Sequence, residues 1–574
     1  EGRMLIPLGI AFIVALFAST VVALTLTPVL CSYMLTTKRA LKKNEKEPFV
    51  SRTLKVGYKK ALEWALRHKK MVIGTSAALL IFSIIIMTGL GRSFLPPFNE
   101  GSLTINISTM PGISLEESDN MGRMAEKILL DIPEIQTVAR KTGRAELDEH
   151  ALGVNVSEME APFELDKRSR DEFLADVRHR LGELKGVNIE IGQPISHRID
   201  AMLSGTKANI AIKLFGNDLN KLYNIGGQIK EAIQGIDGIA DLTLEQQIER
   251  PQLQIKPKRD MLAKYGIPLP EFSEFINVAL SGKVVSQVYE GGKVFDLTVK
   301  VHDDDKANME QIGNLMIDAN GQKIPLHYVA EILPLVGPNT ISRENVQRKI
   351  VVSANVAGRD LNGVVKDIQK TVGEQITLPE GYHVEYGGQF ESEQAASRTL
   401  FLTSVISILL IFLLLFNEFH SMPLSGIIML NLPLAIIGGV ISIWFTSGVI
   451  SIPSIIGFIS LFGIATRNGI LLVSHYNHLR EEGLNLRESI IQGSLDRLNP
   501  ILMTALTSAL ALIPLAVGGD LPGNEIQSPM AQVILGGLLS STLLNGFVVP
   551  IVYFLLNRKK EASIVTPQEI QADL

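Results

Sequence analysis

Seven long apolar stretches divide the chain, at residues 5–35, 71–90, 398–416, 424–445, 449–475, 501–519 and 530–556. A helix needs about 20 predominantly apolar residues to cross the hydrocarbon core of a bilayer. Each stretch is close to that length or longer. The pattern therefore predicts a membrane protein whose transmembrane part is a bundle of seven helices.

Basic residues predict how this bundle is oriented. The linker 37–70 is rich in Lys and Arg, as is the start of the tail 558–574, and such segments stay on the cytoplasmic side of the membrane. Counting spans from the linker places the polar block 92–397 outside the cytoplasm. Within the linker, "LKVGYKKALEWALRHKK" has apolar residues at helical spacing among basic ones, which favours a helix on the membrane surface. A solvated connector is the alternative.

The polar block contains an internal repeat. Four segments each give a β-rich run, a helix with apolar residues at i, i+3 and i+4, and a second β-rich run: 103–140, 163–192, 210–245 and 350–388. Units of this kind pair into split βαβ sandwiches of the ferredoxin-like type. We predict one subdomain at 92–205 and a second formed by 206–254 and 348–397.

A different piece, residues 255–347, interrupts the second subdomain. It contains the predicted hairpin "VVSQVYEGGKVFDLTVKV", which turns at Gly291 and Gly292. The predicted fold class is thus an α+β membrane protein, with a seven-helix bundle and a large extramembrane region of βαβ subdomains.

Composition narrows the chemistry. The 574 residues are 46% hydrophobic, with a net charge of -5 and one cysteine, Cys31, so neither a disulfide within the chain nor a cysteine-based metal site can form. Phosphate-loop, dinucleotide, serine-hydrolase and zinc-protease motifs are all missing. We expect a secondary transporter rather than an enzyme, driven by an ion gradient, although a separate ATPase subunit is an alternative.

The start of the chain suggests a fragment. Residue 1 is Glu, and the first apolar run begins without a basic segment before it. We identify no signal peptide and expect an N-terminal portion to be missing.

Four ordered motifs carry a resemblance that extends over essentially all 574 residues: "SFLPPFNEGSLTINISTMPGIS", "GQPISHRIDAMLSGTKANIAIKLFG", "GIATRNGILLVSHYNHLREEG" and "RLNPILMTALTSALALIPLAVG". The chain resembles the C-terminal portion of the heavy-metal efflux subfamily of the resistance-nodulation-division (RND) transporters. In that frame, residues 1–36 and 71–91 are the sixth and seventh of twelve spans, and 398–557 hold the eighth to twelfth. The two sandwiches become porter subdomains, and 255–347 becomes a docking subdomain.

The resemblance implies a proton-driven antiporter of the bacterial inner membrane with a large periplasmic domain. Family members are typically homotrimers that join a periplasmic adaptor (membrane fusion) protein and an outer-membrane channel protein. No cofactor is expected, since the metal cation and protons are substrates.

Polar residues inside the apolar stretches are candidates for the proton relay. A charge at the bilayer centre costs roughly 3 kcal/mol, so such residues normally face the bundle interior and act on ions. The family places basic residues at the positions of Arg467 and Arg497 and a hydroxyl at that of Thr504, and Asn468 follows Arg467 directly. These groups work with aspartates on the fourth span, which this chain does not contain.

Each of these residues also has a simpler interpretation. Arg467 could extend to the membrane surface or pair with a neighbour, and Arg497 could be a cytoplasmic anchor. Some copper and silver transporters have an acid at the position of Arg467 and a lysine at that of Ile501. This sequence departs from their pattern, which leaves their particular relay in doubt.

The resemblance also implies a metal site in the porter cleft. Three methionines bind the ion in copper and silver transporters, and they align with Asn106, Glu158 and Ala201, which precedes Met202. The methionine set is therefore not reproduced, although a shift of one residue would bring Met202 into the site.

Other candidate ligands surround these positions. An acidic residue of the family cleft aligns with Glu160, and Asp200 and His150 are close in sequence. Oxygen and imidazole ligands favour divalent zinc, cobalt, nickel or cadmium over copper or silver. A half-exposed strand would also explain Glu158 and Glu160 around Met159, and Asp200 could merely form a surface pair with Arg198.

Two other functions compete with proton-driven efflux of heavy-metal cations. An RND pump for drugs or other organic molecules would be favoured by aromatic cleft walls, but aromatic residues make up only 6% of the chain. A proton-driven protein-export or structural membrane component should lack the paired porter repeats and the docking hairpin.

Overall fold

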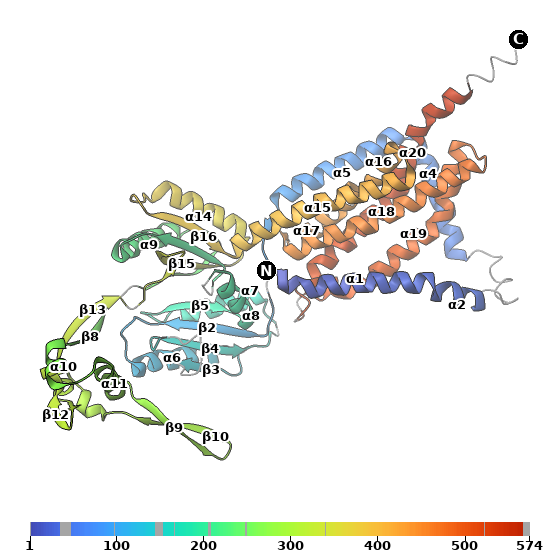
Figure 1. Ribbon diagram of the computed structural model, residues 1–574. Coiled ribbons are helices and arrows are strands. Elements are labelled where there is room, and N and C mark those ends of the chain that lie inside the picture. The colour runs from blue at the N-terminus through green and yellow to red at the C-terminus, as the bar shows by residue number, and fades with distance from the viewer. Residues whose placement is uncertain are drawn as a thin grey trace, which may run out of the picture.

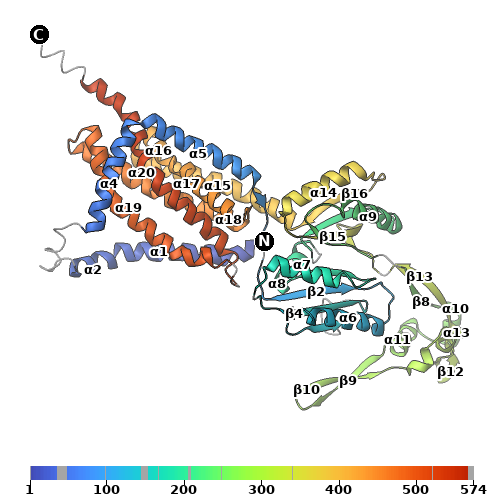
Figure 2. The same cartoon turned by 180° about the vertical axis from the view of Figure 1, so that it is seen from behind.

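Two parts of the molecule lie end to end, a bundle of long helices and an elongated region of sheets and shorter helices (Figure 1). The computed structural model describes residues 2–34, 48–96, 98–143, 153–165, 167–204, 208–246, 249–338, 340–519, 521 and 523–565. The same two parts are seen from behind in Figure 2. Residues 37–47 of the linker and 566–574 of the tail lie outside these ranges.

The bundle contains long apolar helices. They are α1 (Gly2–Leu24), α2 (Leu26–Met34), α5 (Lys69–Gly89), α15 (Gln389–Phe419), α16 (Met422–Met429), α17 (Asn431–Phe445), α18 (Ile452–Glu481), α19 (Leu486–Val517) and α20 (Gln527–Val565). Within the described ranges, seven segments are long and apolar enough to cross a membrane. Helix α20 packs along α17, α18 and α19, whereas α1 and α2 lie at one side with exposed side chains.

Prolines remove backbone hydrogen bonds at several points in the bundle helices. The predicted span 424–445 is divided between α16 and α17 at Leu430, because Pro433 has no N–H to donate to the carbonyl of Met429. In α20, Pro550 likewise leaves the carbonyl of Gly546 without its helical donor. The hydroxyl of Tyr58 donates to that carbonyl at 2.6 Å, so a residue from outside α20 satisfies the freed acceptor.

Tyr58 belongs to α4 (Phe49–Arg67), which lies across the ends of the bundle helices that are remote from the sandwiches (Figure 1). Its buried side chains Leu62 and Leu66 join a core formed by α16, α18, α19 and α20. The side chain of Asn499 in α19 donates to Ser51 at 2.7 Å. Part of the apolar surface of α4 is therefore packed against protein, while most of its basic residues are exposed.

The first sandwich has a four-stranded antiparallel sheet in the order β3-β4-β2-β5. Its strands are β2 (Ser102–Ser108), β3 (Ala139–Thr142), β4 (Val156–Pro162) and β5 (Asn188–Gly192), and its helices are α6 (Leu115–Leu130), α7 (Arg170–Leu181) and α8 (Pro194–Ser204). Helices α6 and α7 bury one face of the sheet in an apolar core that includes Ile105, Ile107 and Met159.

The second sandwich has a sheet in the order β14-β15-β6-β16, with β7 also paired to β15. Its elements are β6 (Ile210–Phe215), α9 (Leu219–Ile233), β7 (Ile239–Leu244), β14 (Arg343–Glu344), β15 (Gln347–Val356), α14 (Leu361–Gln375) and β16 (His383–Gly388). Strand β16 passes directly into α15. One strand of this sheet is therefore continuous with a bundle helix.

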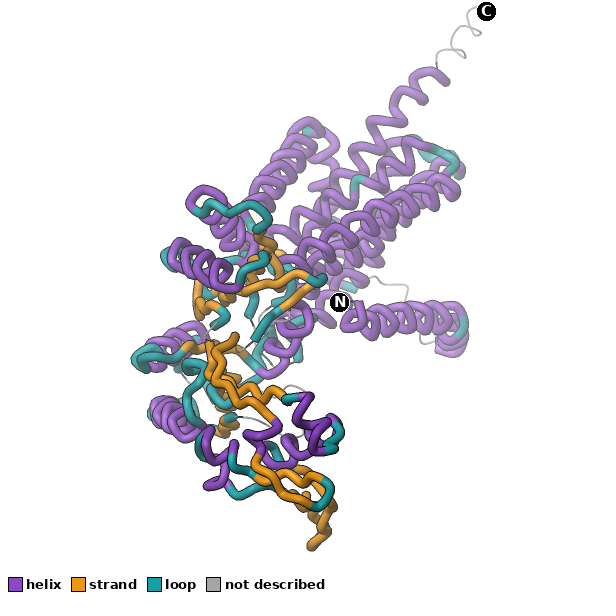
Figure 3. Tube along the Cα trace, turned by 60° about the vertical axis from the view of Figure 1, so that its left-hand side comes forward, coloured by secondary structure: helices purple, strands orange, loops and turns teal. Residues whose placement is uncertain are grey.

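The inserted region extends away from the bundle, as the tube view shows (Figure 3). Two long strands, β8 (Glu249–Pro257) and β13 (Ala330–Pro338), lead into and out of the inserted region and pair along their whole length. It contains α10 (Arg259–Tyr265), α11 (Leu269–Leu280), β9 (Lys283–Glu290), β10 (Lys293–Val299), η1 (Asp303–Lys306), α12 (Met309–Gly313), β11 (Met316–Ala319), β12 (Gln322–Pro325) and α13 (Leu326–Val329). The hairpin β9–β10 turns at Gly291 and Gly292, which both have positive φ.

A short connection also joins the sandwiches to the bundle. Strand β1 (Gly91–Arg92) follows α5 and pairs in parallel with β17 (Val449–Ile450), which precedes α18. The amide of Gly91 donates to the carbonyl of Gly448 at 3.0 Å. These contacts fix the bundle ends beside the first sandwich.

Candidate functional site

The first sheet has a polar face opposite its apolar core. Alternation along β2 sends Ile105 and Ile107 into the core and Asn106 to the other side. Asn106 is directly opposite Glu158 of β4 and Glu190 of β5. Such cross-strand neighbours have Cβ atoms about 5 Å apart, so the strand pairing brings one amide between two carboxyl groups.

Helix α8 covers this polar face. Its N-terminus is held by the carboxylate of Glu100, which accepts from the amides of Ile195 at 2.6 Å and Ser196 at 3.1 Å, a favourable place for a negative charge. The imidazole of His197 lies on Gly192, where a Cβ atom would be 1.9 Å from Nε2. Its Nδ1 is 3.4 Å from the Asn106 amide nitrogen. Glycine at 192 therefore makes room for the histidine above the sheet.

Asp200 lies one turn after His197 on α8 and connects the two sandwiches to the bundle. Its carboxylate accepts from Gln389 Nε2 at 2.7 Å and from Asn209 Nδ2 at 3.2 Å. Gln389 is the first residue of α15, and Asn209 immediately precedes β6. Asp200 is only 2% exposed, and burial raises its pKa to about 6. It is therefore not part of a surface pair with Arg198.

The other two carboxyl groups are also paired. Lys141 Nζ lies 2.8 Å from Glu158 Oε1, and the hydroxyl of Thr243 donates to Glu190 at 3.1 Å. Among the described residues, no three His, Cys, Asp or Glu side chains are grouped so that they could hold a metal ion. A metal cargo would therefore require these pairs to rearrange.

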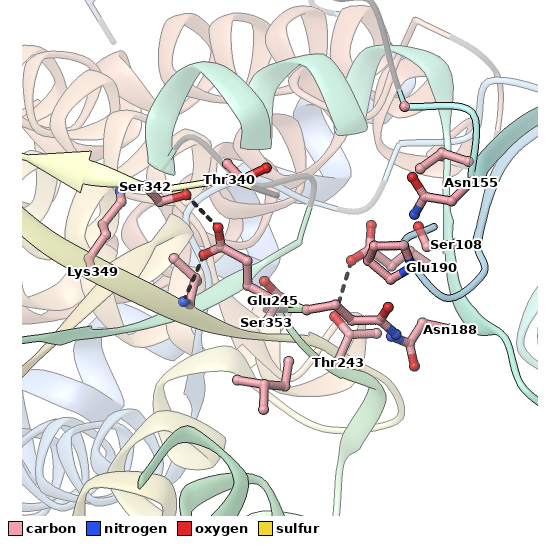
Figure 4. A pocket seen from close by; sticks show the side chains of 16 residues that line it. Ser108, Asn155, Asn188, Glu190, Thr243, Glu245, Thr340, Ser342, Lys349 and Ser353 are labelled. Atoms are coloured by element: carbon pink, nitrogen blue, oxygen red, sulfur yellow. Dashed lines mark hydrogen bonds between the residues drawn. The ribbon is translucent and has the colours of Figure 1, made fainter. Parts of the chain in front are cut away.

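Two cavities border this site. One of about 590 Å³ lies between the two sandwiches and is lined by Glu190 and Glu245 (Figure 4). Glu245 accepts from the hydroxyl of Ser342, and burial raises its pKa. A larger cavity of about 1030 Å³ borders α8, and both His197 and Asp200 line it.

Three of the predicted ligands do not join the group of polar side chains around Asn106. Glu160 is on the polar face but its side chain is exposed, and it is opposite Thr104 rather than Asn106. Met202 is 76% exposed, because it lies two residues beyond Asp200 and turns to another side of α8. His150 lies outside the described residues.

In the bundle, Arg467 and Asn468 point to different sides of α18. Arg467 is exposed, whereas Asn468 is buried. Consecutive residues of a helix are turned by about 100°, so in the described chain the two side chains do not share one face of α18. Among the described residues, Arg467 forms no ion pair with a carboxylate.

Arg497 and Thr504 lie on α19 and are both half-buried. Thr504 donates to the carbonyl of Ile501 in its own helix at 3.0 Å. Within the described ranges, Arg497 Nε has no hydrogen-bond partner. Helices α18 and α19 contact each other where His475 Nε2 is 3.2 Å from Asp496 Oδ2.

Comparisons with known proteins agree with this architecture. The AcrB/AcrD/AcrF family matches residues 1–557. The chain belongs to this family. Protein HelA of Legionella pneumophila is 33% identical over 99% of this chain and 55% of its own length. The cobalt-zinc-cadmium resistance protein CzcA of Cupriavidus metallidurans is 32% identical over 98% of this chain and 54% of its own.

A solved structure shows the same fold. The X-ray crystal structure of a heavy metal efflux pump matches with a TM-score of 0.76 and 28% identity, over 89% of this chain and 52% of that one. These relatives confirm the resemblance to the heavy-metal efflux subfamily of RND transporters. The chain spans about half the length of the relatives it matches.

For this AcrB/AcrD/AcrF family member, the sequence prediction missed His197 and Glu190. The sequence contains a pattern that indicates each of these two residues. Glu190 stands between Ile189 and Ile191, as Glu158 stands beside Met159, which indicates a polar position on a third strand. His197 precedes Asp200 by three residues, which is the spacing of neighbours on one helix face.

Proposed function

We propose that the intact protein exports divalent heavy-metal cations across the bacterial inner membrane in exchange for protons. Zinc, cobalt, nickel and cadmium are the preferred cargo in this proposal, and copper and silver are disfavoured. The metal and the protons are substrates, and no cofactor takes part. Family membership and a relative named for cobalt, zinc and cadmium resistance support this assignment.

The observation that carries the proposal is the donor set on the polar face of the first sheet. Glu158, Asn106 and Glu190 follow one another across three strands, and His197 lies above Asn106. Carboxylate and amide oxygens with an imidazole suit borderline and harder divalent ions. Thioether ligands, which suit copper and silver, are supported by Met202 alone, and its side chain is exposed.

The present pairing of these groups suggests how cargo would be taken up. Lys141 holds Glu158, and Thr243, in the second sandwich, holds Glu190. A relative movement of the two sandwiches would release Glu190 and open the cavity of about 590 Å³ between them. A divalent cation entering there would displace Lys141 from Glu158 by charge repulsion. Asp200 and His197 would receive or release the cation on the side of the larger cavity.

Proton coupling is assigned to the bundle. Arg467 is the candidate cation of the relay, with Asn468, Arg497 and Thr504 as polar neighbours along α18 and α19. A cation exposed on the side of an apolar helix needs an anionic partner. In the intact protein, this partner would be a carboxylate on the family's fourth span. Protonation of that partner would release Arg467 and allow the helices to move.

The proposal includes the assembly typical of the family. The intact protein would be a homotrimer, with residues 92–397 in the periplasm, bound to an adaptor protein and an outer-membrane channel. The hairpin β9–β10 supports a subunit contact, because Val288, Tyr289 and Phe295 are exposed apolar residues on it.

Deletion of the intact gene tests the proposal. Cells should become sensitive to zinc, cobalt, nickel or cadmium salts and keep their resistance to copper and silver. Complementation by the wild-type gene should restore resistance, and complementation by a Glu158→Gln gene should restore it only in part. Sensitivity only to dyes and antibiotics would contradict the proposal.

A further inference from the structure

Three asparagines are buried in the bundle with amide atoms that have no hydrogen-bond partner among the described residues. Asn431 begins α17, Asn468 lies near the midpoint of α18, and Asn545 lies in α20. Each is at most 2% exposed. Among the described residues, nothing bonds to the amide nitrogen and oxygen of Asn431 and Asn545 or to the amide oxygen of Asn468. Unpartnered polar atoms of this kind are costly to bury.

The packing brings the three asparagines to one level of the bundle. Asn431 lies against α18, because a Cβ atom at Gly469 would be 1.9 Å from its Nδ2. Helices α18 and α20 run parallel, since Leu461 lies on Gly537 and the Tyr553 hydroxyl donates to Asn477 at 2.6 Å. The two contacts have the same offset in residue number between α18 and α20. With this offset, residue 545 of α20 lies at the height of residue 469 of α18.

The contacts between α17 and α20 place Asn431 and Asn545 at the same height along the bundle. Helices α17 and α20 are antiparallel, with Gly438 on Gly536 and Ser540 donating to the carbonyl of Leu434 at 2.9 Å. Continuing this register brings Asn431 within one helical turn of Asn545. The three side chains thus lie where α17, α18 and α20 meet.

The chemistry of the amides selects the ligand. A carboxamide has both a donor nitrogen and an acceptor oxygen, so a bound cation would leave the nitrogens unsatisfied and an anion would leave the oxygens unsatisfied. Water satisfies both. Pro433 also frees the carbonyl of Met429 in the same region as a further acceptor. The unpartnered atoms are enclosed by protein, so a side chain from outside cannot reach them.

We propose that Asn431, Asn468 and Asn545 form an enclosed water-binding site at the centre of the bundle. Buried waters typically make about three hydrogen bonds to otherwise unsatisfied polar groups, which these amides offer. The site lies on a different face of α18 from Arg467. Its role in transport rests on the proposed function: the bound water supplies a hydrogen-bonded path for protons beside the relay helix.

Radiolytic hydroxyl labelling of the intact protein in lipid nanodiscs tests the site, because bound water generates radicals next to buried side chains. Ile428 touches the position of Gly469 and packs with Leu472. Both should be labelled several-fold faster than Leu461, which is fully buried in an apolar cluster of the same bundle. Equal and slow labelling of all three would overturn the proposal.

A pair of glycine variants on α18 provides the matched comparison. Gly469→Ala should displace the Asn431 amide, expel the water and abolish the rapid labelling of Ile428. Gly463→Ala should leave it unchanged, since a Cβ atom there meets nothing within 4 Å. If Gly469→Ala does not fold, Asn545→Leu should abolish the labelling and Asn545→Ser, which keeps a polar group and adds room, should retain it. Rapid labelling in both Asn545 variants would overturn the assignment.

Transport by the same variants separates the site from the proposed function. Loss of rapid labelling together with slower proton-coupled efflux supports both parts of the inference. Loss of labelling with unchanged efflux would overturn the role in proton transfer. If the wild-type protein carries no metal while Ile428 is still labelled rapidly, the proposed function fails and the water site stands.

Discussion

The cleft between the two sandwiches and the helix bundle both bury polar side chains, but the carboxylates of the cleft are paired, whereas three buried asparagines of the bundle have amide atoms without a partner among the described residues. In the cleft, Asp200 accepts from two amides and Glu158 is paired with Lys141. In the bundle, the amides of Asn431 and Asn545 have no partner among the described residues. The carboxylates of the cleft are therefore satisfied by neighbouring side chains, whereas these two asparagine amides are not satisfied within the described part of the bundle.

This difference indicates which contacts must change when each part functions. A paired cleft must break existing contacts before it binds a cation, which favours a two-state cycle of opening and closing. Unsatisfied amides enclosed in an apolar bundle instead call for bound water. The two regions meet at Gln389, which bonds to Asp200 and begins α15. Movement of α15 would thus act directly on the buried carboxylate.

The largest effect is expected from Arg467→Ala in the intact protein. Removing the charge takes away the cationic half of the proposed relay, so proton-coupled metal efflux should be abolished while trimers still form. Efflux assays in cells and size-exclusion chromatography measure the two results. Arg487→Ala, at an exposed position on α19, is the matched control and should transport normally. Normal efflux by Arg467→Ala would remove Arg467 from the relay.

The next largest effect is a pH dependence caused by Asp200. Its pKa is raised to about 6 by burial, so the folded protein holds this proton more tightly than the unfolded chain does. Stability should therefore fall as pH rises from about 4 to about 6, by up to about 3 kcal/mol. Hydrogen exchange of the α8 amides, corrected for the intrinsic pH effect, measures this loss.

Asp200→Asn isolates that contribution. The variant cannot ionise, so the local stability of α8 should no longer fall over this pH range. Asp131→Asn removes an exposed aspartate and should behave like the wild type. A wild-type stability that rises between pH 4 and 6 would show that the ionised carboxylate is favoured by its partners instead.

A smaller effect of opposite sign is expected from the two partners of one ion pair. Glu158→Gln should weaken zinc binding about tenfold, or about 1.4 kcal/mol, because a carboxylate ligand is lost. Lys141→Ala should strengthen binding, because Glu158 becomes available without displacing a cation. Calorimetric titration of the purified intact protein measures both affinities, with Lys185→Ala, at another exposed lysine, as the control. Weaker binding in Lys141→Ala would mean that Lys141 holds Glu158 in place for the metal.

The smallest effect concerns the attachment of α4. Tyr58→Phe removes the hydroxyl that satisfies the carbonyl freed by Pro550, which should cost about 1 kcal/mol of stability. Thermal unfolding measures the change, and Tyr33→Phe, at an exposed position, should have none. Equal melting temperatures for both variants would show that water replaces the hydroxyl.

Periodicity predicted much of the architecture, because apolar runs and alternating strands are local properties of the chain. The β9–β10 hairpin illustrates this, since its two glycines adopt the positive φ that the turn requires. The division of the span 424–445 was missed, although Pro433 carried a signal for it. Asn106 and Glu158 were identified, but the inclusion of Glu190 and His197 depends on strand register and on how α8 crosses the sheet.

The direction of individual side chains was the least predictable feature. Arg467 and Asn468 are adjacent in sequence, yet one is exposed and the other is buried. Met202 turns outward although it is close in sequence to Asp200. Such differences arise from the packing of distant helices and strands, which a local pattern does not contain.

Reconstitution of the intact protein into liposomes with an imposed pH gradient tests the central claim most directly. Metal and proton fluxes are recorded together with a zinc-sensitive dye and a pH-sensitive dye. Antiport predicts that zinc or cobalt moves against the proton flux, and that Glu158→Gln and Arg467→Ala reduce both fluxes together. Transport of organic dyes with no movement of any divalent metal would contradict the account.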